Sequence, residues 1–320
     1  MEWLTHAFGL GRPRVVVHAG CGQTNPLGVL RLETSQGVFA VKRFEHEPRR
    51  VALAIESAAY AAGFPMPQPL RTREGKLYVA YLHAGSPVWT RVYAWVEGSA
   101  CDWGVVDPRL SHHLGSLLAA LHALPVPAEA LQEDPWMPLG WSGWEQLTAQ
   151  AIAKGVAWAQ TLREKIPALV EWEEHVRTCA VSDEQLVPSQ RDLHPPNILR
   201  CVDGRHVVVD WDTAGPVNAR EEVAKFALVW ASAPEQAPSK AAVQAFIRGY
   251  RAAGGHFVSR GILDLTHQAR TLLWWLAYNV RRDVNENPGP DPDLTPALLA
   301  GVCEVDLERL QQTAGLFEQS

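Results

Sequence analysis

The first third of the chain alternates between short apolar runs and turn-forming residues, which is typical of β-strands separated by turns. A helical pattern interrupts it at residues 49–62, where apolar residues recur every three or four positions and Gly63 provides a stop. This part is therefore predicted to be a small sheet with one helix. The strands are predicted at residues 14–17, 29–34, 38–42, 77–82 and 88–96.

The pattern changes at Glu97-Gly98-Ser99, which breaks the last apolar run. From Asp107 onward apolar residues recur with helical spacing, and Pro108 suits the first position of a helix. The second part of the chain is therefore predicted to be mainly helical. The helices are predicted at about residues 107–125, 143–179 (one or two helices), 221–230, 239–253, 260–283 and 295–314.

A polar segment between two apolar strands carries the most specific chemical signal. Asp192 and Asn197 are five residues apart, and Asp210 follows a short hairpin whose turn is Asp203-Gly204. The hairpin is predicted to bring the three side chains to one end of the strand pair. This spacing is the catalytic arrangement of kinases, in which one aspartate orients the acceptor hydroxyl while the asparagine and the second aspartate hold Mg²⁺.

Three earlier features fit the same arrangement. Gly20 and Gly22 lie between the first two strands, where they either form a simple turn or let the backbone approach phosphates closely. Lys42 ends a strand, where it is either a surface lysine or the lysine that pairs with the α- and β-phosphates. Glu56 is the candidate carboxylate partner of Lys42, with Glu47 as a competitor.

The run Asp-Leu-His-Pro-Pro-Asn-Ile-Leu at residues 192–199, followed by Val-Val-Asp-Trp-Asp at 208–212, resembles the aminoglycoside phosphotransferase family. These small-molecule kinases have a protein-kinase-like fold. The resemblance implies an α+β, two-lobe fold with a mainly β N-lobe containing one helix and a mainly helical C-lobe. The expected boundaries are residues 1–92 for the nucleotide-binding N-lobe, 93–98 for the hinge and 99–320 for the C-lobe with the catalytic loop and acceptor site.

The resemblance also implies that the backbone of the hinge reads the adenine edge of the nucleotide. The candidate hinge residues are Tyr93, Ala94, Trp95 and Val96. The sequence departs from the family at two positions, because Gln190 replaces the usual histidine and Pro196 replaces a frequent glycine. A glutamine side chain keeps a donor and an acceptor, so a functional enzyme is still expected.

The expected chemistry assigns one role to each candidate residue. Asp192 would accept the acceptor's hydroxyl proton, Asn197 and Asp210 would bind Mg²⁺, and Lys42 would hold the phosphates of ATP or GTP. Arg191 either neutralises phosphate or pairs with an acid, and Asp212 either faces a cationic substrate or is an inert loop residue. The candidate substrate-binding residues are Asp212, His194 and Arg191.

Composition limits the class of protein. The chain has 320 residues, of which 47% are hydrophobic, so it can bury one large core or two modest ones. No apolar run reaches the roughly 20 residues that span a bilayer, and the first residues do not follow the order of a signal peptide. The five cysteines form no Cys-x-x-Cys pair. We therefore expect a cytoplasmic protein with reduced thiols.

Charge is distributed unevenly along the chain. Residues 1–98 carry 11 basic and 7 acidic side chains, whereas residues 99–320 carry 18 and 28. A positive first lobe suits a polyanion such as ATP, and a negative second lobe would attract a cationic acceptor; alternatively, the charges only solvate two surfaces. Basic residues are not interleaved with aromatic ones, so neither nucleic acid nor membrane is an expected partner, and the oligomeric state is open.

The leading hypothesis is an ATP-dependent phosphotransferase that phosphorylates a hydroxyl group of a small molecule. The resemblance points to an aminoglycoside or another antibiotic, and so to resistance or self-protection. One alternative is a metabolite kinase acting on an amino alcohol, a sugar or homoserine. The other is a nucleotide-binding pseudoenzyme with a scaffold or regulatory role. A protein kinase is disfavoured because neither Asp-Phe-Gly nor Ala-Pro-Glu follows the last strand.

Overall fold

The structure is a computed structural model, and its contacts divide the chain into two compact units. It describes residues 1–20, 27–127, 129, 131, 137–179, 186–233, 236–285, 293–303 and 307–318. The first unit comprises residues 1–105, 120–131 and 188–216. The second unit comprises residues 106–119, 132–187 and 217–320. The expected lobe boundary at residues 93–98 is a different division of the chain and stays a prediction.

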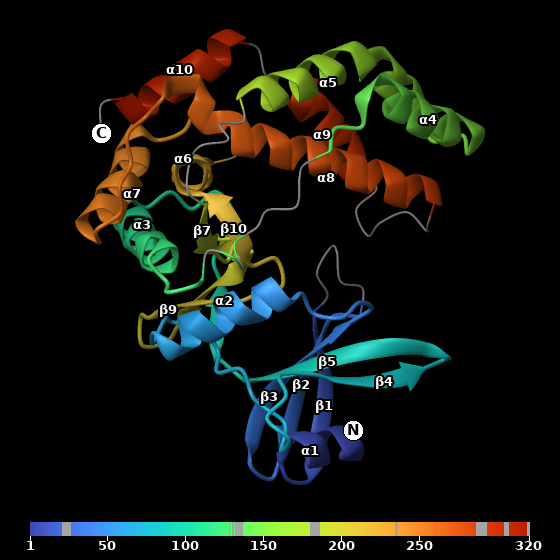
Figure 1. Cartoon of the computed structure of the whole chain (residues 1–320), viewed down its shortest axis with the longest axis vertical. Helices are drawn as coiled ribbons and strands as arrows, with labels where there is room; N and C mark the ends of the chain where they lie inside the picture. Colours follow the sequence, from blue (N-terminus) through green and yellow to red (C-terminus); the bar gives the residue numbers. More distant parts are fainter. Residues whose placement is uncertain are drawn as a thin grey trace. The chain divides into compact units, whose positions relative to one another are not determined.

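An antiparallel five-stranded sheet dominates the first unit (Figure 1). Its order is β1-β2-β3-β5-β4, so the two edges are β1 and β4. The predicted strands in this region are confirmed, with ends that differ by a few residues. The strands are β1 Pro13–Gly20, β2 Val29–Thr34, β3 Gly37–Phe44, β4 Val79–His83 and β5 Ser86–Ala94.

One face of this sheet is covered by a short helix, α1 (Glu2–Phe8), which the sequence pattern did not predict. Leu4 and Phe8 of α1 form an apolar cluster with Leu32 and Val41 of the sheet. A helix of seven residues is too short to show a clear period, so its formation depends on this packing. The expectation of a single helix beside the sheet was therefore wrong.

The opposite face of the sheet carries charged side chains. Lys42 of β3 stands directly opposite Arg91 of β5 in the antiparallel register. Successive side chains of a strand point to opposite faces, so Lys42 and Arg91 share the face that Val41 does not occupy. Helix α2 (Arg50–Ala61), close to its predicted range, places the fully buried Glu56 against this face.

A second, smaller sheet in the first unit carries the polar segment of interest. Its order is β6-β8-β9, with all neighbours antiparallel. The strands are β6 Gly98–Ala100, β8 Ile198–Cys201 and β9 His206–Val208. Two further strands, β7 (Leu186–Ser189) and β10 (Gly215–Asn218), pair with each other. The β8–β9 pair is the predicted hairpin.

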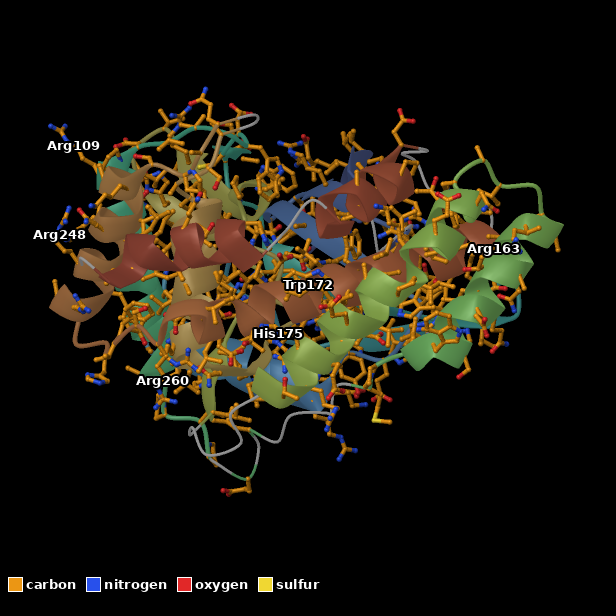
Figure 2. All side chains as sticks on the ribbon, turned by 90° about the horizontal axis from the view of Figure 1, so that it is seen from above. Arg109, Arg163, Trp172, His175, Arg248 and Arg260 are labelled. Carbon is orange, nitrogen blue, oxygen red and sulfur yellow. The ribbon has the colours of Figure 1, made fainter. Side chains whose placement is uncertain are left out.

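The second unit is helical, as the 3.6-residue period predicted. Trp144 of α4 and Trp158 are buried with apolar residues of α5, α8 and α9, so these two tryptophans belong to the core. Arg109, Arg248 and Arg260 lie on the outside of this unit (Figure 2). The helices are α3 Pro108–His122 (which ends in the first unit), α4 Gly140–Ala153, α5 Ala159–Cys179, α6 Ala219–Val229, α7 Lys240–Ala252, α8 Thr266–Asn285, α9 Leu294–Cys303 and α10 Leu307–Glu318.

The mainly β first unit and the helical second unit confirm the predicted α+β class. Within the described residues, no helix combines the length and the apolar character that crossing a membrane requires. Cys101 and Cys201 are both free thiols. The side chains of the other three cysteines lie outside the described part of the structure.

The buried pair of Glu56 and Arg91 generates a stability prediction. Replacing Glu56 by Gln leaves the guanidinium of Arg91 buried without its counter-charge, which costs about 3–5 kcal/mol for a pair of this kind. We expect the free energy of unfolding of Glu56→Gln to fall by about 3 kcal/mol, measured by urea denaturation followed by circular dichroism.

The matched control is Glu97→Gln. Glu97 is 75% exposed and lies 3.7 Å from Arg31, so its loss should change the free energy of unfolding by less than about 0.5 kcal/mol. Equal effects of the two substitutions would contradict the role assigned to the buried pair.

Candidate active site

The β8–β9 hairpin brings the predicted motif residues together. Asn197 closes a short 3₁₀ turn (Pro195–Asn197) just before β8, and Val209 follows β9. The backbone N–H of Val209 donates to the carbonyl oxygen of Asn197 at 2.9 Å, so Asp210 begins beside Asn197. The side-chain Nδ2 of Asn197 donates to Oδ2 of Asp192 at 2.7 Å. Asp192, Asn197 and Asp210 therefore lie at one end of the hairpin.

The carboxylate of Asp192 uses its two oxygens in two directions. Oδ2 accepts the hydrogen bond from Asn197, and Oδ1 pairs with Nδ1 of His194. The side chain of Asp192 is 36% exposed, so the group also remains accessible. A second bond from Nδ2 of Asn197 to the Asp192 carbonyl oxygen, at 2.9 Å, fixes the amide. This arrangement leaves Oδ1 of Asn197 as the oxygen that can bind a cation.

Gln190 connects the loop of Asp192 to the loop of Asp210. Its side chain is fully buried and donates to the carbonyl oxygens of Val209 at 3.1 Å and Asp210 at 2.6 Å. Its Oε1 accepts from the backbone N–H of Asp192 at 2.9 Å. The carboxamide thus serves as donor and acceptor at once, the capacity expected of it from the sequence.

The backbone on both sides of this connection is strained. Arg191 has a φ of +70° and Asp210 a φ of +59°, in the left-handed region that residues with a side chain seldom adopt. Such conformations cost of the order of 1 kcal/mol or more each and persist only where surrounding bonds impose them. Gln190 supplies two of those bonds, since it holds the carbonyl group of Asp210 and the N–H group of Asp192.

Lys42 lies inside β3, two residues before its end, and not at the strand end expected from the sequence. Its ammonium group contacts two carboxylates. Nζ is 2.7 Å from Oδ1 of Asp210 and also forms an ion pair with Asp212. Burial disfavours the charged lysine, but the two carboxylates outweigh it and raise the pKa of Lys42 above its usual value. The lysine is therefore held in its charged form beside Asp210.

The expected partnership of Glu56 with Lys42 is not formed. The carboxylate of Glu56 pairs with Arg91 and accepts from the hydroxyl group of Tyr93 at 3.0 Å. Arg91 stands opposite Lys42 on the sheet, and its Nη2 contacts Oε2 of Glu56, so the buried guanidinium group has an opposite charge. The signal was present in the sequence, because a lone arginine inside the apolar run at residues 88–96 needs a buried acid.

Asp212 lies beside Lys42, where its carboxyl group is largely buried. Burial raises the pKa of Asp212 to about 6, against the opposing effect of the Lys42 ammonium, and the nearby charge of Asp210 adds to the rise. Its carboxylate is directed to Lys42. The predicted role of Asp212 toward a cationic substrate has no contact in support and stays a prediction.

Arg191 and His194, the two other candidate substrate-binding residues, flank Asp192. The guanidinium of Arg191 lies over Gly215, where an added Cβ would stand 2.5 Å from Nη1. His194 pairs with Asp192, and its ring faces the indole of Trp103 with 5.5 Å between ring centroids. The sequence analysis did not identify Trp103, because a single tryptophan in a loop belongs to no motif or periodic pattern.

Two of the four candidate hinge residues already use their backbone N–H groups. The N–H group of Ala94 donates to Gln68 at 2.9 Å, and that of Trp95 donates to Val38 at 3.1 Å. Tyr93 is buried, with its hydroxyl group on Glu56. Among the four candidates, Val96 keeps a backbone N–H for which no bond is seen within the described residues.

The glycine-containing loop is described only at its start. Gly20 ends β1 with a φ of +136°, and an added Cβ there would meet no atom of the described residues within 4 Å. Gly22 lies outside the described residues.

The donor set fits a divalent cation bound jointly by protein and nucleotide. Asp210 offers a carboxylate and Asn197 a carbonyl oxygen, which are ligands that Mg²⁺ accepts together with phosphate oxygens. In the described part of the chain, no cluster of three or more His, Cys, Asp or Glu side chains could hold a metal ion alone. Such a site would depend on the phosphates for its remaining ligands.

Comparison with known proteins agrees with this geometry. The sequence pattern of the phosphotransferase enzyme family matches residues 22–256. No sequence among curated proteins matches the chain significantly.

Solved structures similar to this chain include three small-molecule kinases. A spectinomycin phosphotransferase solved with ADP and spectinomycin has a TM-score of 0.71 and 16% identity, covering 100% of this chain and 97% of that one. A choline kinase from Streptococcus pneumoniae has a TM-score of 0.62 and 15% identity, and the match covers 97% of each chain. A microcompartment-associated aminopropanol kinase has a TM-score of 0.65 and 16% identity, and the match covers 98% of this chain and 97% of that one. These likenesses confirm the protein-kinase-like fold.

The bonds of Gln190 predict a local effect on the loop. Gln190→Ala leaves two carbonyl groups and the N–H group of Asp192 without their partner, and an unpaired buried group costs about 1–3 kcal/mol. We expect the free energy of unfolding to fall by at least about 2 kcal/mol and the Asp192 amide to exchange its hydrogen faster. Gln190→His keeps one donor and one acceptor, so its free energy of unfolding should fall less than that of Gln190→Ala.

The control is Gln160→Ala, which removes an exposed glutamine bonded only to Glu164 in the described structure. This substitution should change neither the free energy of unfolding nor the exchange rate of the Asp192 amide measurably. Unchanged exchange of the Asp192 amide in Gln190→Ala, measured by hydrogen–deuterium exchange, would show that Gln190 does not hold this loop.

Proposed function

This chain belongs to the phosphotransferase enzyme family, and we propose that it transfers the terminal phosphoryl group of ATP to a hydroxyl group of a small molecule. The observation that carries the proposal is the joint position of four side chains. Asp192 is bonded to Asn197, Asn197 adjoins Asp210 through the backbone, and Asp210 is paired with Lys42. The proposed base, the two proposed metal ligands and the proposed phosphate-binding lysine are thus linked in series by hydrogen bonds and an ion pair.

Asp192 acts on the acceptor in this proposal. Its carboxylate accepts a hydrogen bond from the acceptor hydroxyl and takes its proton late, as the bond from oxygen to phosphorus forms. Asn197 and His194 hold the carboxylate from its two oxygens, so it presents a fixed direction to the acceptor. Positioning of this kind supplies a large part of the acceleration in phosphoryl transfer.

Asn197, Asp210 and Lys42 act on the nucleotide. Oδ1 of Asn197 and the carboxylate of Asp210 would hold Mg²⁺, which neutralises charge on the phosphate oxygens when bound. Lys42 would move from the carboxylates to the α- and β-phosphates, within reach of the same loop. Glu56 supports this face indirectly, because it fixes Arg91 beside Lys42.

The nucleotide would be enclosed by the first part of the chain. The backbone around Gly20 and Gly22 would approach the phosphates, and the segment of Tyr93, Ala94, Trp95 and Val96 would read the base. Because Ala94 and Trp95 already use their N–H groups, Val96 is the best placed of the four to donate to adenine. We retain residues 1–92, 93–98 and 99–320 as the proposed N-lobe, hinge and C-lobe.

The acceptor is proposed to be an aminoglycoside or another antibiotic, with a role in resistance or self-protection in the cytoplasm. The similarity to the spectinomycin phosphotransferase supports this choice. A metabolite kinase for amino alcohols is the second candidate, because the choline and aminopropanol kinases are similar to this chain at comparable TM-scores. A nucleotide-binding scaffold would not need Asp192 in its bonded geometry, and we place it third.

Replacing Asp192 tests whether the chain is an enzyme or a nucleotide-binding scaffold. We expect Asp192→Asn to lower kcat by about 10²–10⁴-fold with a similar KM for ATP, because a general base contributes about this much and does not bind the nucleotide. The measurement is Mg²⁺-dependent ADP release with spectinomycin, kanamycin, choline and 1-amino-2-propanol as acceptors.

The control is Asp203→Asn, in the exposed turn of the same hairpin, where Asp203 pairs only with Arg205 in the described structure. Its kcat should match that of the wild type. Binding of ATP without turnover on any acceptor would support the scaffold instead, and turnover that Asp192→Asn preserves would overturn the assignment of the base.

A further inference from the structure

Trp103 is an exposed tryptophan beside the residues that hold Asp192. Its side chain is 59% exposed, and its indole lies 5.5 Å from the ring of His194 at an interplanar angle of 43°. His194 in turn pairs with Oδ1 of Asp192. Trp103, His194 and Asp192 therefore form a continuous row of three side chains, here called the Trp103 wall. More than half of the Trp103 side chain therefore lies outside the core of the first unit.

The chain just before Trp103 is anchored to the strand that follows the motif. β6 pairs with β8 up to the partners Ala100 and Leu199, and the N–H group of Cys101 donates to Ile198 at 2.9 Å. The two strands approach closely at Gly98, where an added Cβ would stand 3.0 Å from the carbonyl oxygen of Arg200. Trp103 follows β6 by three residues, and Asn197 directly precedes β8, so both residues flank the same pair of strands.

His194 and Asn197 contact different oxygens of the Asp192 carboxylate. Oδ2 of Asp192 faces Asn197, which belongs to the proposed metal and phosphate side. Oδ1 faces His194 and, beyond it, Trp103. A molecule whose hydroxyl group reaches Asp192 from the Oδ1 side would therefore rest on the indole.

The chemistry of the wall favours a cationic nitrogen on that molecule. The face of an indole ring attracts ammonium groups, and tryptophan is the strongest of the aromatic residues in this interaction. Asp102, the exposed neighbour of Trp103 in the chain, adds a negative charge to the same loop. An aromatic face beside an acid suits an amine better than a neutral or anionic group.

We propose that Trp103 is a specificity-determining residue of the acceptor site, and that it binds the ammonium group of an amine-bearing alcohol while Asp192 binds the hydroxyl group. The proposal rests on the proposed phosphotransferase function and deepens it. It assigns the choice of acceptor partly to a loop residue outside the catalytic motif. The indole binds the ammonium group through its face, and the carboxylate of Asp102 contributes attraction.

A binding experiment tests the wall without requiring turnover. The full chain is labelled with 5-fluorotryptophan, and the ¹⁹F resonance of Trp103 is identified as the one missing from Trp103→Phe. It is titrated with choline, with spectinomycin and with 3,3-dimethylbutan-1-ol, a neutral molecule of the shape of choline. We expect a saturable shift with at least one of the amines and none with the neutral alcohol. No saturable shift with either amine, or an equal shift with the neutral alcohol, overturns the proposal.

A kinetic experiment tests the same residue during turnover. With the amine that supports the fastest reaction, Trp103→Ala should raise the KM for the acceptor about tenfold, as expected for the loss of a cation–π contact. Trp103→Phe, which keeps an aromatic face, should recover most of this loss. The KM for ATP should change less than twofold. A rise in the KM for ATP with an unchanged KM for the acceptor would place Trp103 on the nucleotide side and overturn the proposal.

The control for exposed aromatic area is Trp3→Ala, since Trp3 is 43% exposed and contacts Tyr81, away from the motif in the sequence. Its KM for the acceptor should equal that of the wild type. If no acceptor gives turnover, the proposed function fails, and the ¹⁹F titration still decides whether Trp103 binds amines.

Discussion

The ion pairs of Lys42 with Asp210 and Asp212 join segments that are 168 residues apart in the chain, measured from Lys42 to Asp210. A lysine that is 8% exposed needs opposite charges, because an unpaired buried ammonium group is strongly unfavourable. Strand β3 and the loop after β9 are thus held together by ion pairs. With both carboxylates engaged by Lys42, the adjacent Arg91 is left to take Glu56, and each buried cation has its own acid.

The loop around Asp192 shows how a replacement inside a motif preserves the geometry. Gln190 takes the place of a histidine that is usual in the family, yet its carboxamide donates twice and accepts once. These bonds oppose the backbone strain at Arg191 and Asp210, both of which have positive φ. The position requires a buried side chain that can both donate and accept, and a ring is not essential to that requirement.

The proposed reaction and the proposed choice of substrate are assigned to different parts of the first unit. The reaction is proposed to depend on Asp192, Asn197, Asp210 and Lys42, which the family pattern covers and which the β8–β9 hairpin and β3 position. The choice of substrate is proposed to depend on the surroundings of the Asp192 carboxylate, where the indole of Trp103 is exposed. A loop beside a reaction centre can change its side chains without disturbing the chemistry.

The sequence by itself determined the strands of the five-stranded sheet, most of the helices and the grouping of Asp192, Asn197 and Asp210, because periodicity and a short hairpin are local features. It did not predict β6 and β10, which are short strands. Only the tertiary structure decided that Glu56 pairs with Arg91, that Asp212 turns to Lys42 and that Trp103 lies against His194. Helix α1 belongs to this second group, since packing on the sheet stabilises it. The physical reason is that charges and rings find partners through strand register and burial, which join residues far apart in the chain.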